Sequence, residues 1–331
     1  MRIKRALPVL SGFLIAALAI TVIVQLRKHA APEAARLLPG ADAFVYLDLS
    51  WMRLTDLGHH LPPVAHDPEY EQFIQATGFQ FERDLREAAV AVHYAGPETG
   101  GETRYSEIFI GKIDGEKLRR YLKSLASKVD SHRAVEIYNI ALQGRILRVA
   151  ILGVDTVAAS NHPDAGVIRG MIERSRKLAS PFAGPALLRQ FYRRVPIASL
   201  AWGIFRMHPA PAPASSDLLS GLSGPATVVA SVRYLRAVHF RAEAFTGDER
   251  AAEQLTAQAS TFLSVFHSAE VAAAGKTPDP DMNQALDSLK VEQNSDRAVL
   301  TATLPTELLR KIVAEAPQEV GPTAEKAGVA R

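Results

Sequence analysis

The longest uninterrupted run of hydrophobic positions covers residues 6–26. These 21 residues (ALPVLSGFLIAALAITVIVQL) contain no charged side chain, and basic residues flank them on both sides. At about 1.5 Å of rise per residue, a helix of this length spans about 30 Å, the thickness of the hydrocarbon core of a bilayer. A cleaved secretory signal has a shorter apolar core and small residues at its cleavage site, which this stretch lacks. The pattern therefore predicts a retained transmembrane anchor.

The charges around this anchor predict its orientation. Three basic side chains and the amino terminus precede the run, and two basic side chains follow it directly: Arg2, Lys4 and Arg5, then Arg27 and Lys28. Basic residues are retained on the cytoplasmic side of a membrane. We expect a single-pass protein of the bacterial inner membrane, with a cytoplasmic N-terminus and an extracytoplasmic, periplasmic domain.

After residue 36, short alternating and helical patterns follow one another in an order that is used twice. In residues 37–194 the patterns predict strands at 44–49, 87–94, 105–113, 135–140, 146–152 and 155–159, and helices at 68–77, 115–125 and 164–177. In residues 195–316 they predict strands at 197–205, 227–234, 237–245, 289–292 and 298–303, and helices that begin after 248 and at 305. Residues 317–331 are expected to be a disordered tail.

Helix boundaries are marked by their usual residues. Asp67 and Pro68 are typical of the start of a helix, and Gly78 is typical of its end. Asp114 is expected to cap a second helix and Asp248 a third. The repeated element order predicts an α+β fold made of two similar halves with antiparallel sheets, and it is compatible with a ferredoxin-like tandem.

Charge and composition exclude several classes of function. The chain carries 38 Lys and Arg against 35 Asp and Glu, but residues 1–36 hold six of the basic residues and one of the acids. The remainder therefore carries 32 basic residues against 34 acidic ones, so the domain lacks the basic footprint of a nucleic-acid binder. The absence of cysteine excludes a disulfide framework, a zinc–thiolate site and a thiol nucleophile.

The start of the domain carries a resemblance. Residues 38–49 (LPGADAFVYLDL), and later residues 77–79 (TGF) followed by 82–85 (ERDL), resemble uncharacterised bacterial envelope proteins that have an N-terminal membrane anchor and then an LPxxDA segment, a strand and an acidic residue. This resemblance covers about a sixth of the chain. It implies the same topology and an α+β envelope domain, and it brings no catalytic residue and no cofactor.

Candidate sites for chemistry are few, and each has an ordinary structural explanation. His59, His60 and His66 with Asp67 form the densest metal-like cluster, but a proline-rich loop offers metal ligands little support. Residues 220–224 (SGLSG) lack the spacing of a nucleophile elbow or a phosphate loop and are typical of a linker. We therefore expect no metal, no cofactor and no catalytic motif.

Three further residues and one charged run remain. Asp48 shares a predicted strand face with Phe44 and Tyr46, but no partner for acid–base chemistry is identifiable in the sequence. His93 and His239 are expected to be satisfied histidines in hairpin strands. The basic run either contacts an anionic surface or forms a solvated helix face, and it consists of Arg169, Arg174, Arg176, Lys177, Arg189, Arg193 and Arg194.

Together these patterns favour a membrane-anchored protein that acts by binding another envelope protein or an envelope ligand, without catalysis. Two alternatives stay open. The first is an envelope hydrolase whose site is assembled from distant residues, which a hydrogen-bonded Ser–His–Asp set or a pair of carboxylates in a pocket would favour. The second is a carrier of a lipid or small ligand with a cleft between the two halves.

Overall fold

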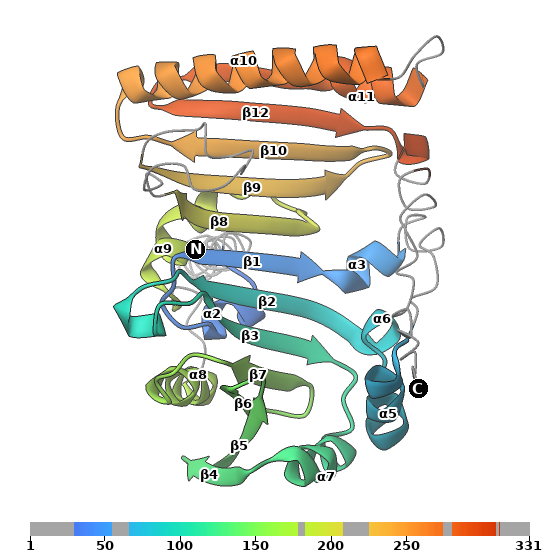
Figure 1. The fold of residues 1–331 in the computed structure, drawn as a ribbon, viewed down its shortest axis with the longest axis vertical. Helices are drawn as coiled ribbons and strands as arrows, with labels where there is room; N and C mark the ends of the chain where they lie inside the picture. Colours follow the sequence, from blue (N-terminus) through green and yellow to red (C-terminus); the bar gives the residue numbers. More distant parts are fainter. Residues whose placement is uncertain are drawn as a thin grey trace, which may run out of the picture.

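A computed structural model describes residues 30–54, 66–177, 183–207, 225–273, 280–308 and 311. Its centre is one 12-stranded sheet in which every neighbouring pair of strands is antiparallel (Figure 1). The strands are β1 (Ala43–Asp48), β2 (Leu85–His93), β3 (Arg104–Gly111), β4 (Lys128–His132), β5 (Val135–Leu142), β6 (Arg145–Ile151), β7 (Thr156–Ser160), β8 (Ala201–Met207), β9 (Ala226–Tyr234), β10 (Val238–Phe245), β11 (Lys290–Asn294) and β12 (Arg297–Leu304).

The strand order is β11-β12-β10-β9-β8-β1-β2-β3-β7-β6-β5-β4. Strands β1 and β8 lie side by side in the middle, and a meander of two further strands leads outward from each of them. The last strand of each half of the chain then returns beside its hairpin, β7 next to β3 and β12 next to β10. The α+β fold with an antiparallel sheet is confirmed.

The ferredoxin-like arrangement is not the one that the sheet adopts. In that arrangement a helical crossover makes the first two strands parallel and leaves space between them. Here β1 and β2 pair directly and antiparallel, with Val45 opposite Val90. Antiparallel pairing satisfies the backbone groups of adjacent strands without a crossover, so the two halves form one continuous sheet rather than two separate ones.

Helices cover both faces of this sheet, and the alternation of side chains along the strands shows which helix lies on which face. They are α2 (Glu33–Leu37), α3 (Leu49–Leu54), α5 (Pro68–Thr77), α6 (Phe81–Asp84), α7 (Gly115–Leu125), α8 (Gly166–Arg176), α9 (Ala186–Phe191), α10 (Glu249–Ala273) and α11 (Pro280–Ser288), with 3₁₀ turns η1 (Pro97–Thr99) and η2 (Tyr192–Arg194). Ile108 of β3 packs into the larger core with α2, α8 and α9, whereas its neighbour Phe109 packs on the opposite face with Leu118 and Leu122 of α7.

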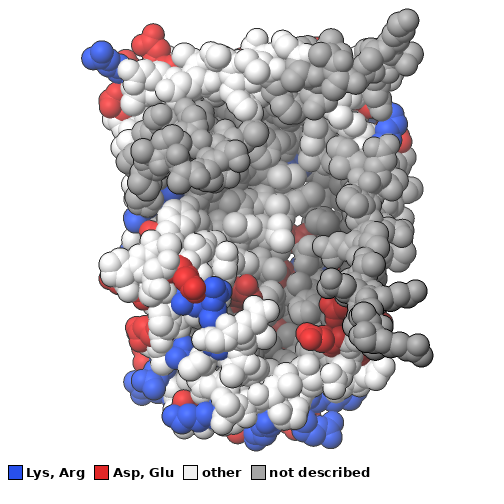
Figure 2. All heavy atoms as spheres, viewed as in Figure 1, with Lys and Arg blue, Asp and Glu red and all other residues white. Residues whose placement is uncertain are grey.

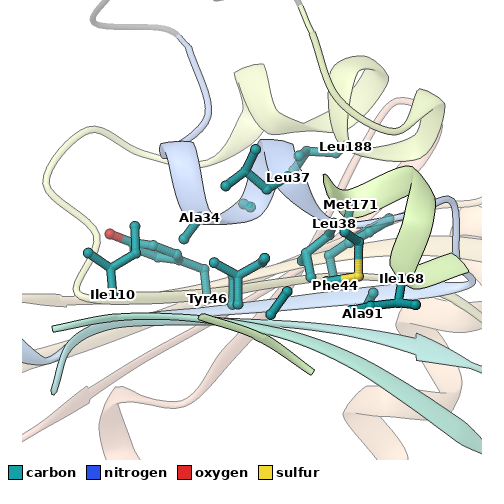
Figure 3. Close-up of a cluster of buried hydrophobic side chains, with 14 of the residues drawn as sticks. Ala34, Leu37, Leu38, Phe44, Tyr46, Ala91, Ile110, Ile168, Met171 and Leu188 are labelled. Atoms are coloured by element: carbon teal, nitrogen blue, oxygen red, sulfur yellow. The ribbon is translucent and has the colours of Figure 1, made fainter. Parts of the chain in front are cut away.

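The larger core lies between the sheet and helices α2 and α8. Figure 3 shows Leu37 and Leu38 at the end of α2 and Met171 of α8 lying over Phe44 of β1. Leu38, Phe44 and Met171 are completely buried. Burying a side chain of this size contributes about 1.5–3 kcal/mol of transfer free energy, so this layer fixes α2 against the middle of the sheet.

The predicted helix boundaries are confirmed where the structure describes them. The Asp67 carboxylate accepts a hydrogen bond from the Tyr70 backbone N–H, Pro68 opens α5, and Gly78 ends it in the left-handed conformation (φ 73°). Asp114 accepts backbone hydrogen bonds at the start of α7. Asp248 does the same for α10, through the backbone N–H of Ala251.

Other elements differ from the prediction. Strand β8 begins at Ala201 rather than at residue 197, because Pro196 has no backbone N–H for a strand ladder and Ala198 adopts a φ of 62°. The prediction missed β4, an edge strand of mostly polar residues, and the helices α2, α6, α9 and α11. Residues 306–308 are helical, as predicted after residue 305.

Several predictions fall on residues outside the described ranges. They are the anchor at 6–26, the loop with His59 and His60, the linker at 220–224 and the tail at 317–331. Within the described part of the chain, no helix combines the length and the apolar character that crossing a bilayer requires.

Candidate functional site

A pocket of about 160 Å³ lies where β1 and β8 meet, at the junction of the two halves. Its walls come from the start of α2, the end of β1, the segment after α9 and the start of β8. Ten residues line it: Pro32, Tyr46, Asp48, Tyr192, Val195, Pro196, Ile197, Ala198, Ser199 and Trp202. The turn that delays the start of β8 therefore forms one wall of this pocket.

Aromatic side chains form the floor. Tyr46 and Trp202 are opposite each other in the β1–β8 register, and their rings stack with centroids 5.4 Å apart. Tyr192 packs edge-on against Trp202 at 5.3 Å. Tyr46 is 5% exposed and Trp202 is 3% exposed. Directly opposed residues of neighbouring strands share a face, so the strand pairing itself builds this aromatic cluster.

One polar group in this floor has no partner. The indole N–H of Trp202 donates no hydrogen bond to any residue that the structure describes, although the side chain is almost completely buried. The buried side-chain atoms without a partner in the described ranges do not include this nitrogen, so it keeps contact with solvent and water can accept from it. Because Trp202 lines the pocket, water or a ligand there is the available acceptor.

One carboxylate lines the pocket, and a second is its register partner on the next strand. Asp48 lines the pocket, and one of its oxygens, Oδ1, accepts hydrogen bonds from the Ser50 hydroxyl (2.6 Å) and the Trp51 backbone N–H (3.1 Å), which leaves Oδ2 available. Glu87 of β2 is the register partner of Asp48. Burial, opposed in part by a hydrogen bond with the Tyr46 side chain, raises the pKa of Glu87, and the charges of Asp48 and Glu33 add to the increase.

The charge of Arg86 opposes the increase in the pKa of Glu87, but its ion pair is with Asp155. Among the described residues, none of the carboxylates of Glu33, Asp48 and Glu87 forms an ion pair, and none of the lining residues is basic. Burial, followed by the charges of Glu87 and Asp48, raises the pKa of Tyr46, which keeps its hydroxyl protonated. The pocket thus combines aromatic side chains with the carboxylate of Asp48, which has no ion-pair partner among the described residues.

A second hollow, of about 340 Å³, lies between α5, α6 and α7. It is also charged, but most of its charges are paired. Arg83 contacts Asp84 at 2.6 Å, and Lys117 lies 3.5 Å from Asp114, which caps α7. Of its charged residues, only Lys112 has no ion pair among the described residues, and its charge acts on the neighbouring Asp84, so this hollow gives no comparable indication of a ligand.

A buried histidine–serine cluster lies between β2, β3 and β7. The Nε2 atom of His93 is 3.0 Å from Ser106 Oγ, which is 2.9 Å from Ser160 Oγ, and the ring of His162 lies against His93 with centroids 4.9 Å apart. Ser106 is completely buried. A nucleophile has to reach its substrate, so this Ser–His pair does not provide an accessible hydrolytic site.

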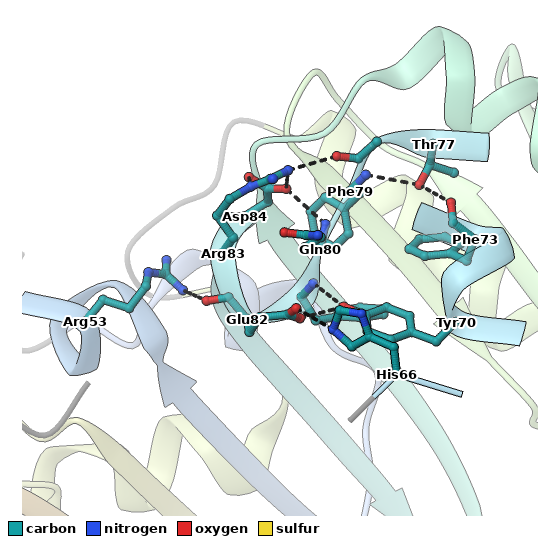
Figure 4. A network of polar contacts seen from close by, with 12 residues as sticks. Arg53, His66, Tyr70, Phe73, Thr77, Phe79, Gln80, Glu82, Arg83 and Asp84 are labelled. Carbon is teal, nitrogen blue, oxygen red and sulfur yellow. Dashed lines mark hydrogen bonds and ion pairs between the residues drawn. The ribbon is translucent and has the colours of Figure 1, made fainter. Parts of the chain in front are cut away.

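The other histidines that the sequence singled out lie elsewhere. His239 Nδ1 is 3.3 Å from the Thr303 hydroxyl. His66 bridges two glutamates, with Nδ1 2.7 Å from Glu71 and Nε2 2.8 Å from Glu82 (Figure 4). Asp67, its neighbour in the metal-like cluster, is engaged as a helix cap. In the described ranges no group of three or more His, Asp or Glu residues is arranged to hold a metal ion.

Several residues of the basic run at 169–194 make contacts within the described part of the protein. Arg174 donates to the Leu37 carbonyl at 2.9 Å, and Arg176 donates to the Arg133 carbonyl at 3.2 Å. Arg194 lies 5.5 Å from the centroid of the Phe245 ring. On the face shown in Figure 2, blue and red atoms are interspersed around α7 and α8, and no broad blue field forms among the described atoms of that face. Contact of this run with an anionic surface stays a prediction.

The sequence indicated part of the pocket. The predicted strand at 44–49 places Tyr46 and Asp48 on one face, which the structure confirms. Tyr192 and Trp202 were missed, because their contact with Tyr46 depends on the pairing of β1 with a strand about 150 residues away. The one local signal was a tryptophan inside a predicted strand.

Comparisons with known proteins concern the fold alone. The sequence matches no model of a known family and no curated protein. A solved structure described as crystal form III of TP0453 is similar with a TM-score of 0.50 and 9% identity, covering 86% of this chain and 98% of that chain. Crystal form I of TP0453 gives a TM-score of 0.46 and 9% identity, covering 86% and 97%.

Proposed function

We propose that this chain is a single-pass, membrane-anchored, extracytoplasmic protein that binds a ligand and carries out no catalysis. The observation that supports binding is the pocket between β1 and β8, where the Trp202 N–H and the Asp48 carboxylate have, respectively, no hydrogen-bond acceptor and no ion-pair partner among the described residues. Pockets that combine apolar walls with a few convergent polar groups are typical binding sites. The anchor and its orientation are supported by the apolar run at 6–26 and its basic flanks.

The proposal includes an internal duplication. Strands β8, β9 and β10 occupy the same places on their side of the sheet as β1, β2 and β3 on the other side, and each half closes with a strand beside its hairpin. Two related halves joined through β1 and β8 would produce this order. The pocket would then be the cleft between the halves, sized for a small ligand rather than for a lipid chain.

Topology is tested with reporter fusions at Arg36 and Glu315, together with mass spectrometry of the mature N-terminus. We expect both fusions to report an extracytoplasmic position and residues 1–26 to be retained. A cytoplasmic signal from either fusion would overturn the localisation. A new N-terminus near residue 30 would replace the anchored protein with a secreted one.

Binding is tested with the fluorescence of Trp202. The chain has two tryptophans, so the Trp51→Phe variant reports from the pocket alone. Small molecules of different charge and polarity are screened for saturable changes in this signal. If none produces one, the proposed binding function is wrong.

A hydrolase is the second candidate, because Asp48 and Glu87 are neighbouring carboxyl groups and burial raises the pKa of Glu87. Paired carboxyl groups of this kind act as acid and base in glycoside hydrolysis. The test is a panel of chromogenic glycosides and esters with the wild type, Asp48→Asn and Glu87→Gln. Turnover by the wild type that both substitutions abolish would replace the binding function with catalysis.

A further inference from the structure

We propose that the pocket between β1 and β8 binds a small organic cation that also carries an acceptor oxygen, as an amino alcohol does. The inference rests on the binding function proposed above and adds the chemical class of the ligand. Charge, ring arrangement and an unpartnered donor each specify one part of that class.

The charge specifies a cation. Asp48 lines the pocket, and its Oδ2 atom accepts no hydrogen bond from a described residue while Oδ1 caps α3. Glu87 and Glu33 lie nearby; the charge of Arg86 acts on Glu87 as well, but no Lys, Arg or His in the described ranges forms an ion pair with any of the three carboxylates. In a partly buried site an unpaired carboxylate gains more from a cationic ligand than from water.

The aromatic side chains fit the same charge. Tyr46, Tyr192 and Trp202 all line the pocket, and their rings contact one another at 5.3–5.4 Å. The electron-rich face of an aromatic ring attracts an ammonium group that lies within about 6 Å of the ring centroid, most strongly for tryptophan. A trimethylammonium group suits this setting because it loses little hydration when the pocket encloses it.

The unpartnered donor specifies the oxygen. Trp202 is 3% exposed, and its indole N–H has no acceptor among the described residues. A cation alone would leave this donor unsatisfied. A hydroxyl or carbonyl oxygen on the ligand would accept from it while the cation faces Asp48.

The volume limits the size of the ligand. A cavity of about 150 Å³ accommodates a molecule the size of benzene, and the pocket measures about 160 Å³. Choline, with its trimethylammonium group and its hydroxyl, is therefore a suitable probe. The same chemistry also occurs in the headgroup of a choline lipid.

The experiment measures choline binding to the full chain, purified in detergent, by Trp202 fluorescence in the Trp51→Phe background. The comparison ligand is the uncharged carbon analogue of choline, in which a tert-butyl group replaces the trimethylammonium group. Tetramethylammonium, which lacks the oxygen, tests the role of the Trp202 N–H. Vesicles of phosphatidylcholine and of phosphatidylglycerol distinguish a lipid headgroup from a free cation.

Asp48→Asn removes the charge and keeps an amide oxygen that can cap α3. Asp114→Asn is the matched control, because Asp114 also caps a helix but lies outside the pocket. Tyr192→Leu removes one ring without touching the charge. Circular dichroism and thermal melting confirm that each variant is folded.

We expect choline to bind at least about tenfold more tightly than its carbon analogue, and Asp48→Asn to abolish that preference. We expect about a three- to tenfold loss with Tyr192→Leu and no change with Asp114→Asn. Binding to phosphatidylcholine vesicles that depends on Asp48 would identify the cation as a headgroup, and binding of choline alone would identify it as a free molecule.

Equal affinity for choline and its carbon analogue, or unchanged choline binding in Asp48→Asn, would overturn the inference. If a neutral ligand perturbs Trp202 and choline does not, the ligand class is wrong while the binding function stands. If no ligand perturbs Trp202, both are wrong.

Discussion

The wild-type protein is expected to lose stability on acidification, in large part because of His93. Replacing His93 with glutamine should make the free energy of unfolding depend much less on pH. His93 is 7% exposed, its Nε2 bonds Ser106, and its ring packs against His162. Burial first, and then the charge that His162 can carry, lower the pKa of His93 to about 4, while Asp42 acts more weakly in the opposite direction. Glutamine can keep the hydrogen bond to Ser106 without taking up a proton.

The direction of this pH dependence follows from which state, folded or unfolded, takes up the proton on His93. The unfolded chain protonates His93 below its ordinary pKa of about 6.5, whereas the folded protein keeps the ring neutral down to about 4. Acid therefore favours the unfolded state. The contribution of His93 to stability is complete above about pH 6.5 and is lost as the pH falls to about 4; at about 1.4 kcal/mol per pH unit, the loss is about 3 kcal/mol.

The assay is urea unfolding of the wild type and His93→Gln at several pH values between about 7 and 4. At neutral pH the free energy of unfolding of the variant should be about 1–2 kcal/mol lower than that of the wild type, because packing and hydrogen bonding are altered. The difference in free energy of unfolding between the wild type and His93→Gln should then shrink, or change sign, as the pH falls. His132→Gln is the matched control, because His132 is only partly buried and contacts Glu173 at the protein surface.

Parallel pH profiles for the wild type and His93→Gln would refute this reasoning, because they would show that His93 takes up its proton equally in the folded and unfolded states. The reasoning would also be refuted if His132→Gln changed the pH dependence of the free energy of unfolding as much as His93→Gln does. The ring signal of His93 in an NMR titration gives an independent check, with a midpoint near 4.

Two further predictions concern the opposite end of the sheet. Hydrogen bonds to Glu71 and then Glu82 raise the pKa of His66, so its contribution to stability is complete below about pH 6.5 and is lost as the pH rises through the folded pKa. His66→Gln should therefore lower the thermal midpoint more at pH 6 than at pH 8, and an equal loss at both would contradict this. Gly111→Ala should destabilise by about 1–3 kcal/mol, because an added Cβ would lie 2.6 Å from a backbone oxygen of α6. Gly115→Ala, where nothing lies within 4 Å, is its control in urea unfolding.

Local signals in the sequence predicted much of the fold. The boundaries of α5 follow from Asp67 and Gly78, since a carboxylate satisfies the first backbone N–H groups of a helix and glycine tolerates the left-handed turn at its end. The faces of β1 follow from alternation, because Phe44 and Tyr46 enter the core while Val45 is 39% exposed. These features depend on neighbouring residues alone.

The parts that could not be predicted depend on distant residues. The alternation of β1 does not reveal that it pairs with both β2 and β8, since an apolar strand accepts any complementary partner. The α2 helix has only five residues and is held by burial of Leu37 and Leu38 rather than by helix propensity. The aromatic floor of the pocket needs both of these long-range contacts, so it became visible only in the structure.

The position of the pocket has a consequence for stability. Tyr46 and Asp48 belong to the first half of the chain, and Trp202 with the turn before it belongs to the second. A ligand there contacts both halves, and at a concentration of one hundred times its Kd it stabilises the folded state by about 2.7 kcal/mol. Because β1 and β8 are adjacent strands of one sheet, separating the halves destroys the site. A ligand should therefore raise the unfolding midpoint reported from both halves together, and a ligand that stabilised only one half would have to bind elsewhere.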